Sequence, residues 1–140
     1  MNGIEIEQVH SIKYLGFDIS DSGNFYCLKN SINDLKVRAN AIVNNFACLD
    51  TDSKIKLFNS QCLSLYGSCL WDLRSKEVNG MEVAWRKSSR RILNIDRRSH
   101  NVLIPHLMCT HDLRIMIEQR IFNFYANCLN HKNKLISNIF

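Results

Sequence analysis

The sequence has one proline and five glycines among its 140 residues, and it contains no apolar run close to the roughly 20 residues that cross a bilayer. So few helix breakers leave little room for long irregular loops and favour a helical protein. The amino terminus lacks the basic head and apolar run of a secretory signal. We therefore expect an intracellular protein, in the cytoplasm or the nucleus, with no membrane partner.

Six cysteines would be enough for a disulfide framework, but no secretory signal precedes them. Five of them fall at or near apolar helical positions, so we interpret them as reduced thiols. A zinc site would have to use Cys109, His111, Cys128 and His131, whose gaps depart from the paired C-x2-C signature. A catalytic cysteine is also disfavoured, because no histidine stands beside a cysteine on an evident turn. We expect no metal site.

The positive charge is concentrated in one segment. Between Arg86 and Arg98 there are six cations and one anion, Asp96, so this segment accounts for the whole net charge of +5. Such a concentration is typical of a surface that contacts phosphates, because the field of neighbouring cations adds up. On such a surface these side chains should point away from the core and be largely exposed. The alternative is an ordinary solvated helix face. The six cations are Arg86, Lys87, Arg90, Arg91, Arg97 and Arg98.

The hydrophobic period changes near Lys29. Before it, the alternation at 4–8, the β-formers at 11–19, a turn cluster at 21–24 and a return at 25–27 predict an antiparallel hairpin. After it, apolar residues recur at helical spacing and predict no further sheet. The predicted fold class is mainly α: an N-terminal β-hairpin of residues 1–28 followed by a helical bundle of residues 29–140.

The first two helices are expected at about 29–49 and 53–71, joined by an acidic junction at 50–52 that would end one and cap the other. The second helix is apolar nearly all round, so we expect it at the centre of the bundle. Gly67 within it costs roughly 1 kcal/mol relative to alanine, which indicates close packing or a distortion there.

Three more helices are expected after the turn at 79–80. One runs over about 81–93, a short one follows a cap at Ser99 and is perturbed by Pro105, and the last runs from near Asp112 to about 129. Tyr66, Trp71 and Trp85 have helical spacing and are expected in the core. In the helix over 81–93, the inward face holds Met81, Ala84, Trp85, Ser88 and Ile92. The last helix has a wide apolar stripe of Leu113, Met116, Ile117, Ile121, Phe124, Tyr125 and Cys128.

Five short motifs follow one another along the chain: Lys13-Tyr14-Leu15-Gly16, Leu65-Tyr66-Gly67-Ser68 with Trp71, Trp85 to Leu93, Arg98-Ser99-His100-Asn101, and Arg120 with Phe124 and Leu129-Asn130. In this order and spacing they resemble the primer grip and thumb of a LINE-type (non-LTR) retrotransposon reverse transcriptase. The resemblance covers about residues 1–130. Ser99 stands where the family usually has threonine.

The resemblance implies a role in holding a template–primer. Tyr14, Leu15 and Gly16 would belong to the primer grip, the hairpin that holds the primer's 3′ end, where a glycine lets a nucleic-acid backbone come close. The cations of residues 86–98 would contact the phosphate backbone without reading sequence. The implied partners are an RNA/DNA template–primer and the upstream palm and fingers of a parent polymerase.

The chain departs from a complete polymerase in one decisive respect. It has no adjacent pair of aspartates, whereas polymerases of this kind use such a box to hold the metal ions, Mg²⁺ in the parent enzyme. Asp50 and Asp52 flank a helix junction and are interpreted as caps. We expect no cofactor in this fragment and no catalysis from it alone. The alternatives are an inactive remnant or a small helical interaction or scaffold domain, and then an endonuclease, which would need a cluster of acidic metal ligands.

Overall fold

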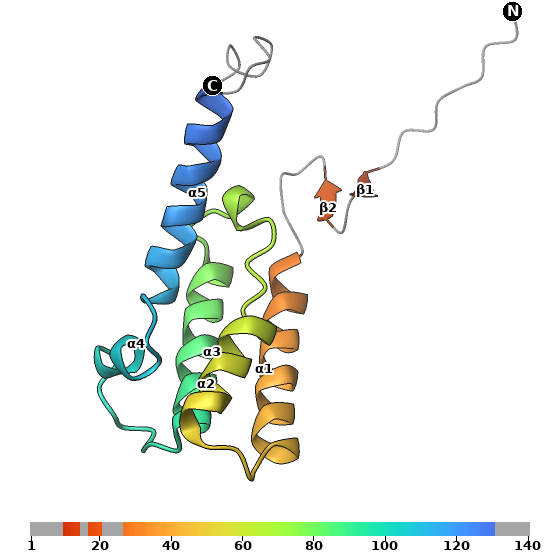
Figure 1. The fold of residues 1–140 in the computed structure, drawn as a ribbon. Helices are drawn as coiled ribbons and strands as arrows, with labels where there is room; N and C mark the ends of the chain where they lie inside the picture. The colour runs from red at the N-terminus through yellow and green to blue at the C-terminus, as the bar shows by residue number, and fades with distance from the viewer. Residues whose placement is uncertain (1–9, 15–16, 21–26, 131–140) are drawn as a thin grey trace, which may run out of the picture.

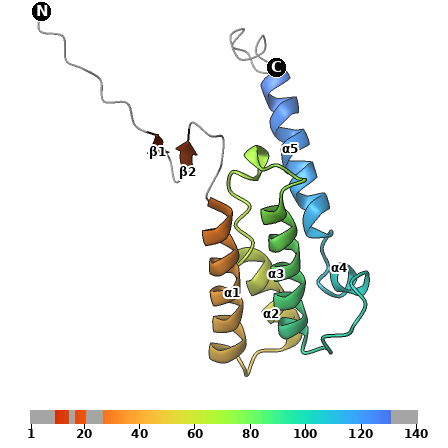
Figure 2. The same ribbon diagram turned by 180° about the vertical axis from the view of Figure 1, so that it is seen from behind.

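The computed structural model describes residues 10–14, 17–20 and 27–130, and most of these residues are helical. The helices α1, α2 and α3 lie side by side, and α5 extends along the other side of α3 (Figures 1 and 2). None of the described helices combines the length and apolarity needed to cross a membrane. The helical elements are α1 (Cys27–Asn45), α2 (Thr51–Gln61), the 3-10 turn η1 (Ser68–Leu70), α3 (Lys76–Leu93), α4 (Leu103–Leu107) and α5 (Leu113–Leu129).

The predicted N-terminal β-hairpin of residues 1–28 is wrong. The β structure described consists of two four-residue strands, β1 (Ser11–Tyr14) and β2 (Phe17–Ser20), which pair antiparallel. Tyr14 pairs with Phe17, so the chain reverses between them, whereas the turn cluster predicted at 21–24 lies outside the described residues. Of the return strand predicted at 25–27, only Cys27 is described, and it begins α1. Between residues 32 and 129, all of which are described, there is no strand, so the helical part of the prediction is confirmed.

Helix α3 is the centre of the bundle. Val78, Met81 and Trp85 are almost completely buried along it, whereas α2, which was predicted to be central, buries only Ile55 and Phe58. The inward face predicted for residues 81–93 is confirmed, because all of its members are buried. The helix begins earlier than predicted because Ser75 caps it, with the Ser75 hydroxyl accepting a hydrogen bond from the Val78 amide at 3.2 Å.

Helix α1 runs beside α3 in the same direction. Ile32 of α1 lies against Gly80 of α3, and Asn40, further along α1, accepts a hydrogen bond from Arg91, further along α3. Leu35, Ala39 and Ile42 of α1 are buried in this interface. Phe46 and Leu49, predicted on the same face, lie beyond the end of the helix, and Phe46 is exposed.

The second helix is shorter than predicted. It begins after Asp50, whose carboxylate accepts a hydrogen bond from the Ser53 amide at 3.0 Å, and this contact lowers the pKa of Asp50. It ends at Gln61 instead of residue 71, and the chain then turns through Gly67, whose φ of 71° is left-handed. Gly67 was predicted within this helix, at a site of close packing or distortion, but it lies beyond the end of α2 and precedes η1. The turn directs Leu65 and Trp71 into the core.

Substituting alanine at the two described glycines should have opposite effects on stability. Gly67→Ala should lower the free energy of unfolding by about 1–2 kcal/mol, because a side chain disfavours left-handed φ. Gly80→Ala should raise it by about 0.5–1 kcal/mol, because the site is helical and the nearest atom to a new Cβ, Ile32 Cδ1, lies at 3.5 Å. Urea denaturation of both variants measures the difference. Equal signs for the two changes would contradict the described backbone.

The last two helices follow a loop that contains Ser99. Ser99 was predicted to cap the fourth helix, but α4 begins after Val102 and has no side-chain cap. Pro105 was predicted to perturb this helix. It lies in the first turn of α4, where backbone amides have no helical acceptor, so the missing amide hydrogen does not disturb the helix and the prediction is wrong. Helix α5 begins after its cap Asp112, as predicted.

Candidate nucleic-acid interface

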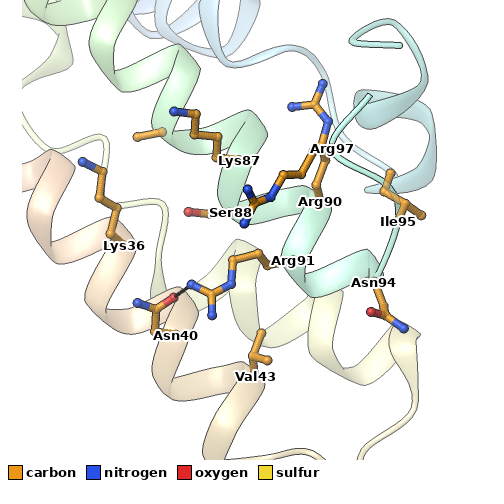
Figure 3. Close-up of a pocket in the computed structure, with 11 residues that line it drawn as sticks. Lys36, Asn40, Val43, Lys87, Ser88, Arg90, Arg91, Asn94, Ile95 and Arg97 are labelled. Atoms are coloured by element: carbon orange, nitrogen blue, oxygen red, sulfur yellow. Dashed lines mark hydrogen bonds between the residues drawn. The ribbon is translucent and has the colours of Figure 1, made fainter. Parts of the chain in front are cut away.

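A groove of about 840 Å³ lies between α1 and α3 and is rich in cations (Figure 3). No carboxylate is among the described residues that line it, so the charge of its cations is not neutralised within the groove. Its lining comes from α1, from the second half of α3 and from the loop that follows α3. The lining residues are Lys36, Asn40, Val43, Ala84, Lys87, Ser88, Arg90, Arg91, Asn94, Ile95 and Arg97.

Helical spacing explains why these side chains meet. Lys36, Asn40 and Val43 stand four and three residues apart, so they lie along one face of α1. Lys87 and Arg91 have the same relation on α3. Because the two helices run in the same direction, the two rows face each other along the groove. Asn94, in a left-handed conformation with φ of 53°, ends α3 and brings the following loop to the groove.

Arg91 is held across the groove by α1. Its Nη1 donates a hydrogen bond to the side-chain oxygen of Asn40 (Figure 3). Asn40 is neutral, so the guanidinium keeps its full charge and its other donors while its orientation is fixed. This geometry suits a phosphate, which accepts two parallel hydrogen bonds from a guanidinium.

Arg90 has a structural role that the sequence did not indicate. Its Nη2 donates to the Ser99 carbonyl oxygen at 2.9 Å and to Asn101 Oδ1 at 2.5 Å, so it fastens the loop after α3 to the helix. It was predicted to be exposed and is half-buried. Arg90 lines the groove, but replacing it would disturb the loop as well as remove a charge.

Arg86 does not belong to the groove, and its predicted exposure is wrong. Its Nη2 lies 3.1 Å from Asp112 Oδ2 and 3.5 Å from Glu82 Oε2, and its side chain is only 23% exposed. Arg114 Nε donates to Glu82 Oε1 at 2.6 Å, and this contact raises the pKa of Arg114. The four charged groups connect α3 to the start of α5. Arg86 therefore stabilises the packing of α5 on α3.

The remaining cations of the segment are exposed, as predicted. Lys87, Arg91, Arg97 and Arg98 are all exposed, and the first three line the groove. Arg98 lies outside the groove lining, and its amide donates to Asp96 Oδ1 at 2.6 Å within the loop. Exposed cations that have no acidic partner are available to phosphates.

Lys36 was missed by the sequence analysis. It lies on α1 beside the buried Leu35, about fifty positions before Lys87, and only the packing of α1 on α3 brings the two ammonium groups to one groove. The available signal was its place at the border of the apolar stripe of α1. Such a position shows which face of its helix Lys36 lies on, but not which other helix packs beside that face.

The predicted primer-grip residues are described only in part. Tyr14 ends β1, paired with Phe17, while Leu15 and Gly16 lie outside the described residues. Of the aromatic residues predicted in the core, Trp71 and Trp85 are buried, as predicted, but Tyr66 is 59% exposed.

The described cysteines differ in their burial and surroundings. The described part of the chain contains no cluster of three or more metal-ligating side chains, and His131 lies outside it. Five described cysteines are free thiols, of which Cys48 and Cys109 are exposed rather than in the core as predicted. Burial raises the pKa of Cys62 to about 11, so this thiol is protonated at neutral pH.

Comparison with protein-family models, with curated proteins and with solved structures gives no match to this chain. The function is therefore inferred from the groove and from the sequence motifs.

Proposed function

We propose that this chain is the template–primer-binding thumb region of a retrotransposon-type RNA-directed DNA polymerase and that it lacks the catalytic aspartates. The main support is the groove between α1 and α3. Its lining has five cations and, among the described residues, no carboxylate. Cations grouped in this way bind phosphates through charge and counterion release, independently of base sequence. The polymerization chemistry would belong to the parent protein.

Two contacts between sequence motifs support this proposal. Arg90, in the motif that begins at Trp85, donates to Asn101 in the next motif. Arg120, in the last motif, donates its Nη1 hydrogen to the Leu65 carbonyl oxygen at 3.2 Å, and Leu65 opens the second motif. Residues from different motifs of the resemblance therefore contact one another, as expected if these motifs belong to one domain.

The alternative is a helical interaction domain, and one observation favours it. The second half of α5 is apolar over much of its circumference but is poorly covered: Phe122 is 71% exposed and Leu129 is 55% exposed. An exposed apolar helix of this kind is usually covered by another protein surface. In the proposed function that surface would be part of the parent polymerase. In the alternative, protein binding would be the whole activity.

Replacing Lys87 and Arg91 together by alanine should weaken binding of an RNA–DNA hybrid. If each contacts one phosphate, the slope of log K against log salt should fall in magnitude by about 1.8, since each lost contact contributes about 0.9. The loss should be similar for hybrids of unrelated sequence. Fluorescence anisotropy between about 50 and 200 mM salt measures both quantities.

The matched control is Lys56→Ala with Lys76→Ala. Both lysines are exposed and lie outside the groove lining. Their substitution removes two positive charges, as Lys87→Ala with Arg91→Ala does. This control should keep most of the affinity. Equal loss in the two double variants, or no hybrid binding by the unmodified chain, would refute the proposal and leave the interaction domain as the better explanation.

A further inference from the structure

The groove between α1 and α3 is narrow for a nucleic-acid duplex. Packed helices have axes about 8–10 Å apart, so the trough between them admits one sugar–phosphate strand but not both strands of a double helix. Its lining on α3 runs from Ala84 to Asn94, which is about 15 Å of helix at 1.5 Å per residue. That length accommodates a few successive phosphates of a single strand.

The chemistry of the lining also fits a strand held by its backbone. Lys36 and Lys87 come from opposite walls, and Arg91 follows one turn further along α3. Val43 and Ile95 give the groove an apolar component that can contact sugars. No aromatic side chain is among the described lining residues, so the groove offers no platform for stacking bases.

We propose that this groove seats one sugar–phosphate strand of a nucleic acid, with Lys36, Lys87 and Arg91 contacting its phosphates and Asn40 positioning Arg91. The proposal deepens the proposed function and rests on it for the nature of the ligand. It assigns a phosphate contact to Lys36, which lies outside the basic segment. It also implies that single-stranded nucleic acid competes with duplex for the same site.

Asn40 permits a test that separates positioning from charge. Asn40→Ala removes the partner of Arg91 without changing any charge, so affinity should fall about three- to ten-fold while the salt slope stays the same. Asn40→Asp places a carboxylate beside Arg91, so both the affinity and the salt slope should fall. Lys36→Ala should lower the affinity and reduce the slope by about 0.7, the value for one contact to a single strand.

The experiment uses the full chain and a labelled single-stranded oligothymidylate of about 12 nucleotides, with an unlabelled RNA–DNA hybrid as competitor. Lys56→Ala is the control for loss of a cation outside the groove, and circular dichroism checks the fold of each variant. We expect the hybrid to displace the single strand and Lys56→Ala to bind normally.

The possible failures can be told apart. A groove-dependent hybrid affinity without single-strand binding would overturn the single-strand inference and leave the proposed function standing. Single-strand binding that depends on Lys36 and Arg91, without hybrid binding, would support the groove inference and overturn the template–primer function. Binding of oligothymidylate that is unaffected by Lys36→Ala and by Asn40→Ala would refute the groove as the site.

Discussion

Replacing Trp85 by alanine should lower the free energy of unfolding by about 3–5 kcal/mol, the usual cost of truncating a large aromatic side chain in a core. Trp85 is 0% exposed and lies at the centre of α3, the helix against which α1, α2, α4 and α5 pack. A domain of this size is stable by roughly 5–15 kcal/mol, so the change would remove a large part of its stability. Urea denaturation followed by far-ultraviolet circular dichroism measures it.

Two further substitutions on α3 make this test specific. Val83→Ala, on the exposed side of the same helix, should change stability by no more than about 0.5 kcal/mol. Trp85→Phe should cost much less than Trp85→Ala, because the indole Nε1 is buried with no hydrogen-bond partner among the described residues and phenylalanine removes that donor. A cost for Trp85→Ala no larger than that for Val83→Ala would contradict the central position of α3.

Replacing Glu82 by glutamine should lower the free energy of unfolding by about 1.5–3 kcal/mol, the range for hydrogen bonds that involve charged groups. The Glu82 carboxylate is only 10% exposed and lies between Arg86 and Arg114. Without its charge, two guanidinium groups at the junction of α3 and α5 lose their shared anion, and only Asp112 remains for Arg86. Chemical denaturation at neutral pH gives the difference directly.

The control for Glu82 is Glu77→Gln. Glu77 is exposed in the first turn of the same helix, where its charge interacts favourably with the helix dipole and makes no ion pair with another described residue, so the loss should stay below about 1 kcal/mol. The nucleic-acid affinity of Glu82→Gln should remain close to that of the unmodified chain, because Glu82 lies outside the groove lining. If the two glutamine variants had equal stability, the ion-pair network would have no structural role.

The sequence by itself determined the features that depend on local pattern. The inward face of α3, the cap at Asp50 and the start of α5 near Asp112 were predicted correctly. Helical periodicity and capping act within a few residues, so a single sequence contains the information they need.

The tertiary structure decided which groups meet across elements. Residues 62–71 continue a helical pattern, yet the chain turns there because Leu65 and Trp71 enter a core supplied by other helices. The strand pairing likewise depends on a reversal at a position other than the strongest turn signal. Periodicity does not specify such long-range partners, and they override it.

Contacts between elements also decide the roles of the cations in the basic segment of residues 86–98. Neighbouring cations in the sequence serve different purposes, since Arg86 pairs with Asp112 and Arg90 binds the loop at Ser99, whereas Lys87 and Arg91 face the groove. Lys36 joins the groove from another helix. Charge composition fixed how many cations the chain carries, but only the packing of α1 and α5 against α3 determined which of them remain available, because an ion pair requires a partner that is distant in sequence.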